Sequence, residues 1–269
     1  MILAIDVGGT KTLLAVFNRD CEKQESVKFE TPKDYPTFIS ELASNVASLT
    51  TKKFRACAVA IPGKIDRENG VGLAFGNLPW ENVPILADIS GFLKCPAYLE
   101  NDANLAGLAE ASYVKDKYKR ALYITVSTGI GGVIISNGDI DLSLRDAEVG
   151  HMLLEHDGKL QRWEEFASGK ALVARTGKRA SEIPEGDSEW YLVARNIAIG
   201  LINVIANVTP DCIIIGGGVG THLEKFKDRL VEELEIYEDK LLNVPPILKA
   251  RDPEEAVVNG CCIYANQLA

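Results

Sequence analysis

The chain has 269 residues, of which 46% are hydrophobic and 25% charged, and its net charge is −9. This composition is typical of a globular protein of about two domains, and it excludes a disordered, fibrous or small disulfide-scaffold protein. The acidic balance argues against a protein that binds nucleic acid without sequence preference, because such binding needs a basic surface. One local pocket can still oppose the overall charge and bind a phosphorylated ligand.

The first residues predict a β-hairpin. Apolar runs at 2–5 and 13–17 flank a glycine-bearing turn at 6–12, and the alternation of polar and apolar residues at 25–31 predicts a third strand.

The same pattern returns near residue 122. Predicted strands at 122–126 and 133–135 flank a second glycine turn at 127–132. A unit that occurs twice predicts two related lobes, since a solenoid needs more copies.

Helical spacing of apolar residues predicts helices over 36–50, 102–114, 188–208, 222–238 and 254–268. A further apolar strand at 213–215 runs into three glycines. Because strands alternate with helices along the whole chain, the predicted fold class is α/β. The charged stretch 113–120 is where we expect the two lobes to join.

The six cysteines are scattered, and no C-x-x-C occurs. This spacing predicts neither a disulfide framework nor a zinc site, and it leaves most or all of the thiols as small buried side chains. No basic segment precedes the apolar start, and Arg195 and three asparagines interrupt the apolar stretch 191–208. We therefore expect a soluble cytoplasmic protein with no membrane partner.

The first glycine turn is a candidate phosphate site. Gly8 and Gly9 allow backbone N–H groups to approach an anion closely, Thr10 adds a hydroxyl donor and Lys11 adds a positive charge. Asp6, at the end of the first strand, could hold a metal ion through water. The alternative interpretation is an ordinary hairpin turn.

Two later glycine clusters strengthen the phosphate interpretation, because two such turns suit a polyphosphate held from both sides. Their candidate residues are Thr128, Gly129, Gly131, Gly132, Gly217 and Gly218. The P-loop motif, the dinucleotide G-x-G-x-x-G and the G-x-S-x-G elbow are all missing from the sequence.

Three polar residues gather where a predicted strand meets a helix. Asp102 is placed to act as a general base, with Asn101 and Asn104 as hydrogen-bond donors. Capping of the helix is the alternative interpretation, because Asn and Asp are good N-cap residues.

A further polar group can bind sugar hydroxyls, which need donors and acceptors together. It comprises Asn77, Glu148, His151 and Glu164. For a single histidine the alternative is an ordinary core or surface residue, and we assign that role to His156 and His222. For Asn77 the alternative is a turn before Pro79.

Taken in order, these segments resemble the ROK family of bacterial and archaeal sugar kinases, which share the two-lobed fold of actin and hexokinase. The matching segments are Asp6–Thr12, Ile61–Gly63, Asn77–Trp80, Glu100–Asn104, Thr128–Gly132, Glu148–His151 and Gly216–Gly218. They span nearly the whole chain. Such an ordered set is far more specific than a single glycine turn.

The resemblance implies a role for each residue. Asp102 would be the catalytic base; Gly63, Asn77, Asn101, Asp102, Glu148, His151 and Glu164 would bind the sugar; Asp6, the two glycine turns and Gly217–Gly218 would bind Mg²⁺ and ATP. The cleft would lie between a lobe of residues 1–112 plus 255–269 and a lobe of residues 113–254. The resemblance also implies a homodimer.

The implied reaction is ATP-dependent phosphorylation of a hexose at its 6-hydroxyl, with glucose first and N-acetylmannosamine as the rival substrate. Many members follow E-x-G-H with a cysteine-rich zinc motif, but residues 152–169 here contain no cysteine, so we predict no structural zinc. A non-catalytic sugar sensor is a second hypothesis, which the intact Asp102 disfavours. A chaperone or filament relative is a third, disfavoured by size.

Overall fold

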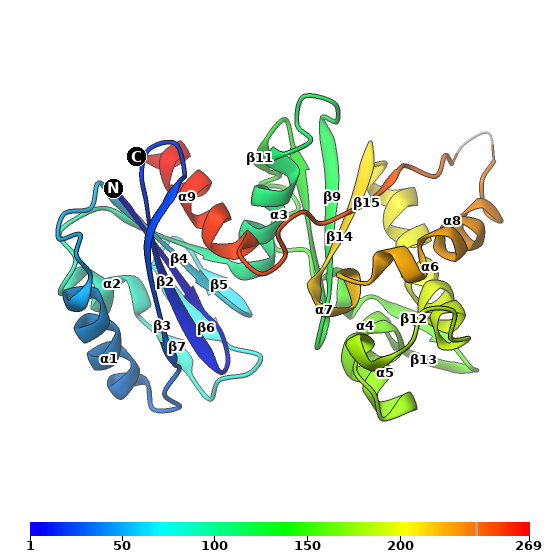
Figure 1. Cartoon of the computed structure of the whole chain (residues 1–269), viewed down its shortest axis with the longest axis horizontal. Helices are drawn as coiled ribbons and strands as arrows, with labels where there is room; N and C mark the ends of the chain where they lie inside the picture. Colours follow the sequence, from blue (N-terminus) through cyan, green and yellow to red (C-terminus); the bar gives the residue numbers. More distant parts are fainter. Residues whose placement is uncertain (240–241) are drawn as a thin grey trace. The chain divides into compact units, whose positions relative to one another are not determined.

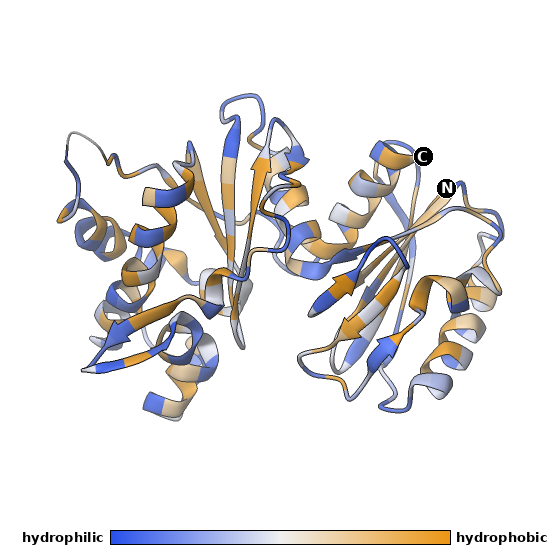
Figure 2. Ribbon diagram, turned by 180° about the vertical axis from the view of Figure 1, so that it is seen from behind, coloured by the Kyte–Doolittle hydropathy of each residue, from blue (hydrophilic) through white to orange (hydrophobic). Residues whose placement is uncertain are grey.

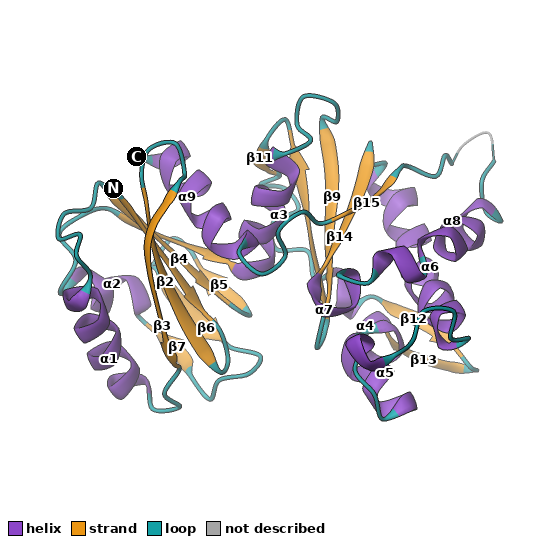
Figure 3. Cartoon of the chain, viewed as in Figure 1, coloured by secondary structure: helices purple, strands orange, loops and turns teal. Residues whose placement is uncertain are grey.

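The computed structural model describes residues 1–239 and 242–269 (Figure 1). The chain forms two compact units: unit 1 comprises Met1–Ala109 and Glu254–Ala269, and unit 2 comprises Glu110–Pro253. Each unit contains a five-stranded mixed sheet, and helices accompany the strands in both (Figure 3). The α/β class predicted from the sequence is confirmed.

The sheet of unit 1 has the order β3-β2-β1-β4-β8. Its strands are β1 (Ile2–Val7), β2 (Lys11–Phe17), β3 (Lys23–Glu30), β4 (Ala56–Ile61) and β8 (Ala97–Asn101). The first three are antiparallel, whereas β4 runs parallel to both β1 and β8. Every residue of β4 is buried, as expected for a parallel strand covered on both faces.

Helices cover both faces of this sheet. They are α1 (Tyr35–Ser48) and α2 (Ile85–Ser90) on one face, and α3 (Asp102–Ser112) and α9 (Ala256–Leu268) on the other. Alanines of β1 and β4 let α9 pack closely, and Gly260 allows α9 to approach α3, because a Cβ there would lie 1.9 Å from the Leu105 carbonyl oxygen. A small sheet of β5 (Lys64–Asp66), β6 (Val71–Ala74) and β7 (Glu81–Val83) completes unit 1.

The sheet of unit 2 has the order β11-β10-β9-β14-β15. Its strands are β9 (Arg120–Val126), β10 (Ile130–Ser136), β11 (Asp139–Ile140), β14 (Cys212–Gly216) and β15 (Ile247–Lys249). The hairpin β9–β10 is antiparallel, and β14 runs parallel to β9 and β15. Because this repeats the arrangement in unit 1, the predicted internal repeat is confirmed.

The remaining elements of unit 2 surround one hydrophobic core. They are the hairpin β12 (Leu153–His156) and β13 (Lys159–Arg162), and the helices α4 (Trp163–Ala167), α5 (Gly169–Thr176), α6 (Glu189–Val208), α7 (Gly217–Gly220) and α8 (Lys227–Glu235). Figure 2 shows largely hydrophobic strands in both central sheets, whereas the helices carry hydrophilic stretches as well.

The single helix predicted over 222–238 is wrong at its start, before residue 227. Leu223–Lys225 forms a short 3₁₀ turn, and the backbone leaves helical geometry at Phe226, with φ −138° and ψ 0°, before α8 begins. Phe226 is buried and stacks on Trp190 with ring centroids 5.6 Å apart. Packing of this side chain therefore overrides the helical period.

The long helix α6 lies in the core of unit 2. Among the described residues it alone has the length and apolar composition that could cross a membrane, and half of that window is buried inside the fold. Its buried side chains include Trp190, Ile197 and Leu201, which pack against the sheet and the neighbouring helices.

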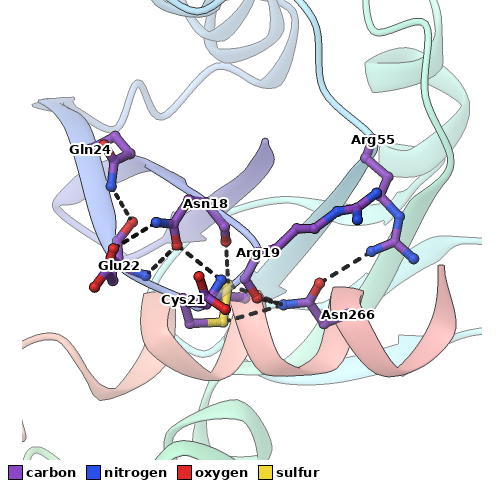
Figure 4. The surroundings of a disulfide bond; sticks show 9 residues. Asn18, Arg19, Cys21, Glu22, Gln24, Arg55 and Asn266 are labelled. Atoms are coloured by element: carbon purple, nitrogen blue, oxygen red, sulfur yellow. Dashed lines mark hydrogen bonds between the residues drawn. A yellow bond between two sulfur atoms is a disulfide. The ribbon is translucent and has the colours of Figure 1, made fainter.

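One pair of cysteines contradicts the expectation that no disulfide forms. Cys21 and Cys262 are bonded, with Cα atoms 5.8 Å apart, although they are 241 positions apart in the sequence (Figure 4). The pair joins the turn after β2 to the last helix, where Asn266 donates to the carbonyl of Arg19. No spacing motif could reveal it, because the tertiary fold alone brings the two segments together. Of the four free thiols, Cys95 is half-buried and the others are buried, as predicted.

We expect the disulfide to be visible as a thiol count. Unfolded protein prepared with oxidised glutathione should titrate four thiols, and reduced protein six, because the other cysteines are free. Reduction should lower the free energy of unfolding by about 2–4 kcal/mol, since the bond constrains the unfolded chain. Cys262→Ser is the control, because its stability should not respond to reductant. Six free thiols in the oxidised preparation would contradict the assignment.

Candidate active site

The polar residues predicted in unit 1 gather at one edge of its sheet. Asp6 pairs in register with Ala60 on β4, and Ile61 pairs with Asn101 on β8. Because β1, β4 and β8 are parallel, their carboxyl ends meet at the same edge, which is where open α/β sheets bind ligands. Asp102 follows directly as the first residue of α3.

The first glycine turn is tighter than predicted. Only residues 8–10 separate β1 from β2, and the Gly8 N–H donates to the Lys11 carbonyl over 3.0 Å. A Cβ on Gly9 would lie 2.5 Å from the Cβ of Asn77, so glycine is needed for the Asn77 loop to approach. The structure thus brings two predicted segments together.

Lys33 joins these two segments and was missed by sequence reasoning. Its ammonium donates to the carbonyl of Gly9 over 2.7 Å and to that of Asn77 over 3.3 Å. The side chain is exposed, so its charge lies beside the glycine turn in contact with solvent. A lone lysine after a predicted strand carries no motif that could have identified it.

Asn101 takes one of the two roles that the sequence left open, which is capping of α3. The Asn101 side-chain oxygen accepts from the backbone N–H groups of Ala103 (2.9 Å) and Asn104 (3.3 Å), which is helix capping. Its amide nitrogen donates to the Gly63 carbonyl over 3.2 Å, tying α3 to the loop after β4.

A buried ion pair supports this corner. Glu100 is 1% exposed and accepts two hydrogen bonds from Arg67. It also accepts from the Asn101 backbone N–H (2.8 Å) and the Asn104 side chain (2.9 Å). Asn104 therefore points to a neighbouring carboxylate, which corrects its interpretation as a ligand donor. Nothing in the local sequence indicated Arg67.

Asp6 has a perturbed carboxyl group. Loss of hydration, with the negative charge of Asp102 as a second cause, raises the pKa of Asp6 from 3.8 to about 7, although Lys28 lowers it in part. A carboxyl group whose pKa is raised by loss of hydration and by a neighbouring negative charge is typical of functional sites.

This shift predicts that Asp6→Asn alters the pH dependence of stability. Between pH 3.8 and about 7 the unfolded carboxyl is ionised while the folded one is protonated, so wild-type stability is lost as pH rises towards 7. The asparagine side chain does not titrate, so the variant does not lose stability in this way. In urea unfolding, the free energy of unfolding of the variant minus that of wild type should therefore increase from pH 4.5 to pH 8, by roughly 4 kcal/mol at most.

Asp20→Asn, at an exposed turn, is the control for the loss of one charge. Parallel curves for wild type and Asp6→Asn would contradict the raised pKa of Asp6.

In unit 2, Glu164 links the predicted histidine to the second glycine turn. One carboxylate oxygen lies 3.4 Å from His151 Nε2, and the other accepts the Ile130 backbone N–H over 3.3 Å. A Cβ on Gly129 would lie 2.5 Å from that second oxygen, so this glycine makes room for the carboxylate. Glu148 is exposed, and its carbonyl accepts from the His151 N–H.

The second glycine turn and the third cluster contact the same strand. The Gly169 N–H donates to the Ser127 carbonyl over 2.6 Å, which joins α5 to the turn that carries exposed Thr128. Gly217 has φ +80°, and a Cβ there would lie 2.6 Å from the Val126 carbonyl oxygen. Gly218 faces open space, so its backbone is accessible to a ligand.

Among residues 1–239 and 242–269, no group of three or more His, Cys, Asp or Glu side chains could hold a metal ion. Asp6 and Asp102 nevertheless fit Mg²⁺, which is usually bound by one or two carboxylates together with substrate phosphates. The absence of structural zinc stays a prediction.

Known proteins match the chain over nearly its whole length. The model of the ROK family matches residues 2–267. The N-acetyl-D-glucosamine kinase of Mannheimia succiniciproducens is 28% identical over 298 residues, covering 97% of each chain. The glucokinase of Streptomyces coelicolor is 28% identical and covers 81% of this chain and 82% of its own. The ROK hexokinase structure from Thermus thermophilus matches with a TM-score of 0.84 at 27% identity, covering 99% and 98%.

Proposed function

The chain belongs to the ROK family, and from that premise we propose that it transfers the terminal phosphoryl group of ATP to the 6-hydroxyl of a hexose, with Asp102 as the general base. The observation that carries the proposal is the position of Asp102 at the head of α3, beside the parallel strand ends and the glycine turn of unit 1. Its kinase relatives support the reaction class.

In the proposed mechanism, Asp102 accepts the proton of the sugar hydroxyl as the oxygen attacks the γ-phosphorus. The bond from phosphorus to the bridging oxygen breaks, and ADP leaves with that electron pair. General-base assistance contributes roughly 10²–10⁴-fold in rate. Asn101, held by its contacts to Gly63 and the first turn of α3, positions a hydroxyl beside the base.

The nucleotide phosphates are assigned to the glycine turns. The Gly8 and Ile130 N–H groups already donate to the Lys11 carbonyl and to Glu164, so the other backbone N–H groups of the two glycine turns, with the hydroxyls of Thr10 and Thr128, would bind phosphate oxygens. Gly217–Gly218 would border the adenosine. Mg²⁺ held by Asp6 would supply charge neutralisation on the phosphates when it is bound. Lys11 and Lys33 add positive charge near the first turn.

The sugar hydroxyls are assigned to Asn77, Asn101, Glu148, His151 and Glu164. Glucose is the first substrate that we propose, and N-acetylmannosamine is the alternative. Relatives named for glucose and for N-acetylglucosamine match at the same 28% identity, so overall similarity favours neither of these sugars. A few hydroxyl and acetamido contacts decide between them.

The substrate prediction is tested by ADP release with Mg-ATP on glucose, N-acetylmannosamine, N-acetylglucosamine, fructose and no sugar. We expect glucose to give the highest kcat/KM and the sugar-free reaction to be negligible. A higher kcat/KM for N-acetylmannosamine would replace glucose with the alternative. If calorimetry detects sugar binding and no ADP forms, the sensor hypothesis replaces the kinase.

Asp102→Asn tests the general base. The amide keeps the shape of the side chain but cannot take a proton, so kcat should fall by roughly 100-fold or more while the thermal midpoint changes little. Asp228→Asn is the matched control, because Asp228 also lies in the first turn of a helix, α8, and is exposed. Near-normal turnover in Asp102→Asn would remove this residue from the base role.

A further inference from the structure

A cluster of buried and partly buried side chains lies directly behind Glu164. It comprises His156, Gln161, Trp163, Phe166 and Asn196, and we name it the His156 cluster. We propose that His156 and Asn196 are positioning residues that set the Glu164 carboxylate against His151 and the second glycine turn. The kinetic part of this inference rests on the proposed sugar kinase function.

His156 is held on three sides. Its ring stacks on Phe166, with centroids 4.1 Å apart and planes 10° from parallel. The Gln161 amide nitrogen lies 3.3 Å from Nδ1 and also donates to the His156 carbonyl over 3.0 Å, and an oxygen of the exposed Asp157 carboxylate lies 3.5 Å from Nδ1. Nε2 is hydrogen-bonded to the Asn196 side-chain oxygen over 3.2 Å.

Asn196 connects this ring to α4. The side-chain amide nitrogen of Asn196 donates to the Phe166 backbone carbonyl over 3.0 Å. The backbone carbonyl of Asn196 accepts a hydrogen bond from the Trp163 indole N–H over 3.0 Å. Asn196 is 6% exposed, so each of these polar atoms needs a protein partner. Gly200 completes the fit, since a Cβ there would lie 2.0 Å from the indole.

Glu164 lies between the two anchored residues of α4. Trp163 and Phe166 are both hydrogen-bonded to Asn196. In addition, the backbone N–H of Trp163 donates to the carbonyl of Met152, the residue after His151. A helix of five residues has little stability of its own, so its position is set by these contacts. The backbone of Glu164 is therefore placed by α6 through the His156 cluster.

Apolar packing supplies only part of this placement on the hairpin side. Leu154 of β12 packs against the core of unit 2, whereas Leu153 and Leu160 are 61% and 69% exposed and bury little surface. His156 is the hairpin side chain that stacks on α4 and bonds α6. Losing its nitrogens should let the hairpin and α4 shift, and with them the oxygens of Glu164 that face His151 and Ile130.

The test compares His156→Phe with His222→Phe. The first keeps a ring to stack on Phe166 and removes both nitrogens; the second changes a histidine that lies 6.1 Å from Trp190, away from Glu164. We expect His156→Phe to raise the sugar KM by about tenfold with the ATP KM within about twofold, and His222→Phe to change neither. An equal rise in both KM values, or no change in a folded His156→Phe, would overturn the proposal.

A second readout is independent of catalysis. The chain has three histidines, so ring-proton NMR resolves each one, and the variants assign them by loss of a signal. The His151 signal should shift in His156→Phe and stay in place in His222→Phe. This result stands even if no hexose is phosphorylated, whereas an unmoved His151 signal refutes the positioning role whatever the substrate.

If His156→Phe does not fold, Gln161→Leu replaces it. Gln161 is only partly buried, and the change removes the donor to Nδ1 while leaving the ring in place. It should shift the His151 signal in the same direction by a smaller amount. A folded Gln161→Leu with an unchanged His151 signal would overturn the proposal.

Discussion

Parallel pairing of β4 with β1 and β8 is the constraint on which unit 1 depends. A parallel strand is covered on both faces, so this pairing requires helices on each side, and alanines in β1 and β4 let α9 pack closely. The same pairing directs Asp6, Gly63 and Asn101 to one edge. The parallel pairing therefore accounts both for the fold of unit 1 and for the grouping of its candidate site residues. The C-terminal helix α9 contributes to both because it covers one face of this sheet.

The two units support their polar residues by different chemistry. In unit 1 a buried ion pair, Arg67 with Glu100, fixes the corner that presents Asn101 and Asp102. In unit 2 the supports behind Glu164 are a histidine ring, two amides and an indole, which are joined by hydrogen bonds. Loss of one partner of a buried ion pair strongly destabilises a fold, whereas loss of one residue from a hydrogen-bonded cluster removes single hydrogen bonds. Substitutions in the support of Glu164 should therefore cost less stability than substitutions at Arg67 or Glu100.

Much of the fold was predictable because its patterns are local. The hairpins, the repeat and most helices follow from apolar spacing and glycine turns, and the capping and catalytic interpretations of residues 101–102 are compatible. Arg67 and Lys33 were missed because each acts through a partner distant in sequence. The sequence predicts only an ordinary core or surface residue at His156, because its partners Phe166 and Asn196 lie on α4 and α6 and are distant in sequence.

The sequence alone determined the α/β class, the two related sheets and the family resemblance, because these depend on residue type and short spacing. The tertiary structure alone decided the Cys21–Cys262 disulfide, whose partners are 241 residues apart, the break at Phe226 and the raised pKa of Asp6. Each of these depends on which segments meet in space and on how much water they exclude. Neither the contacts between distant segments nor the exclusion of water can be predicted from the local pattern of residues.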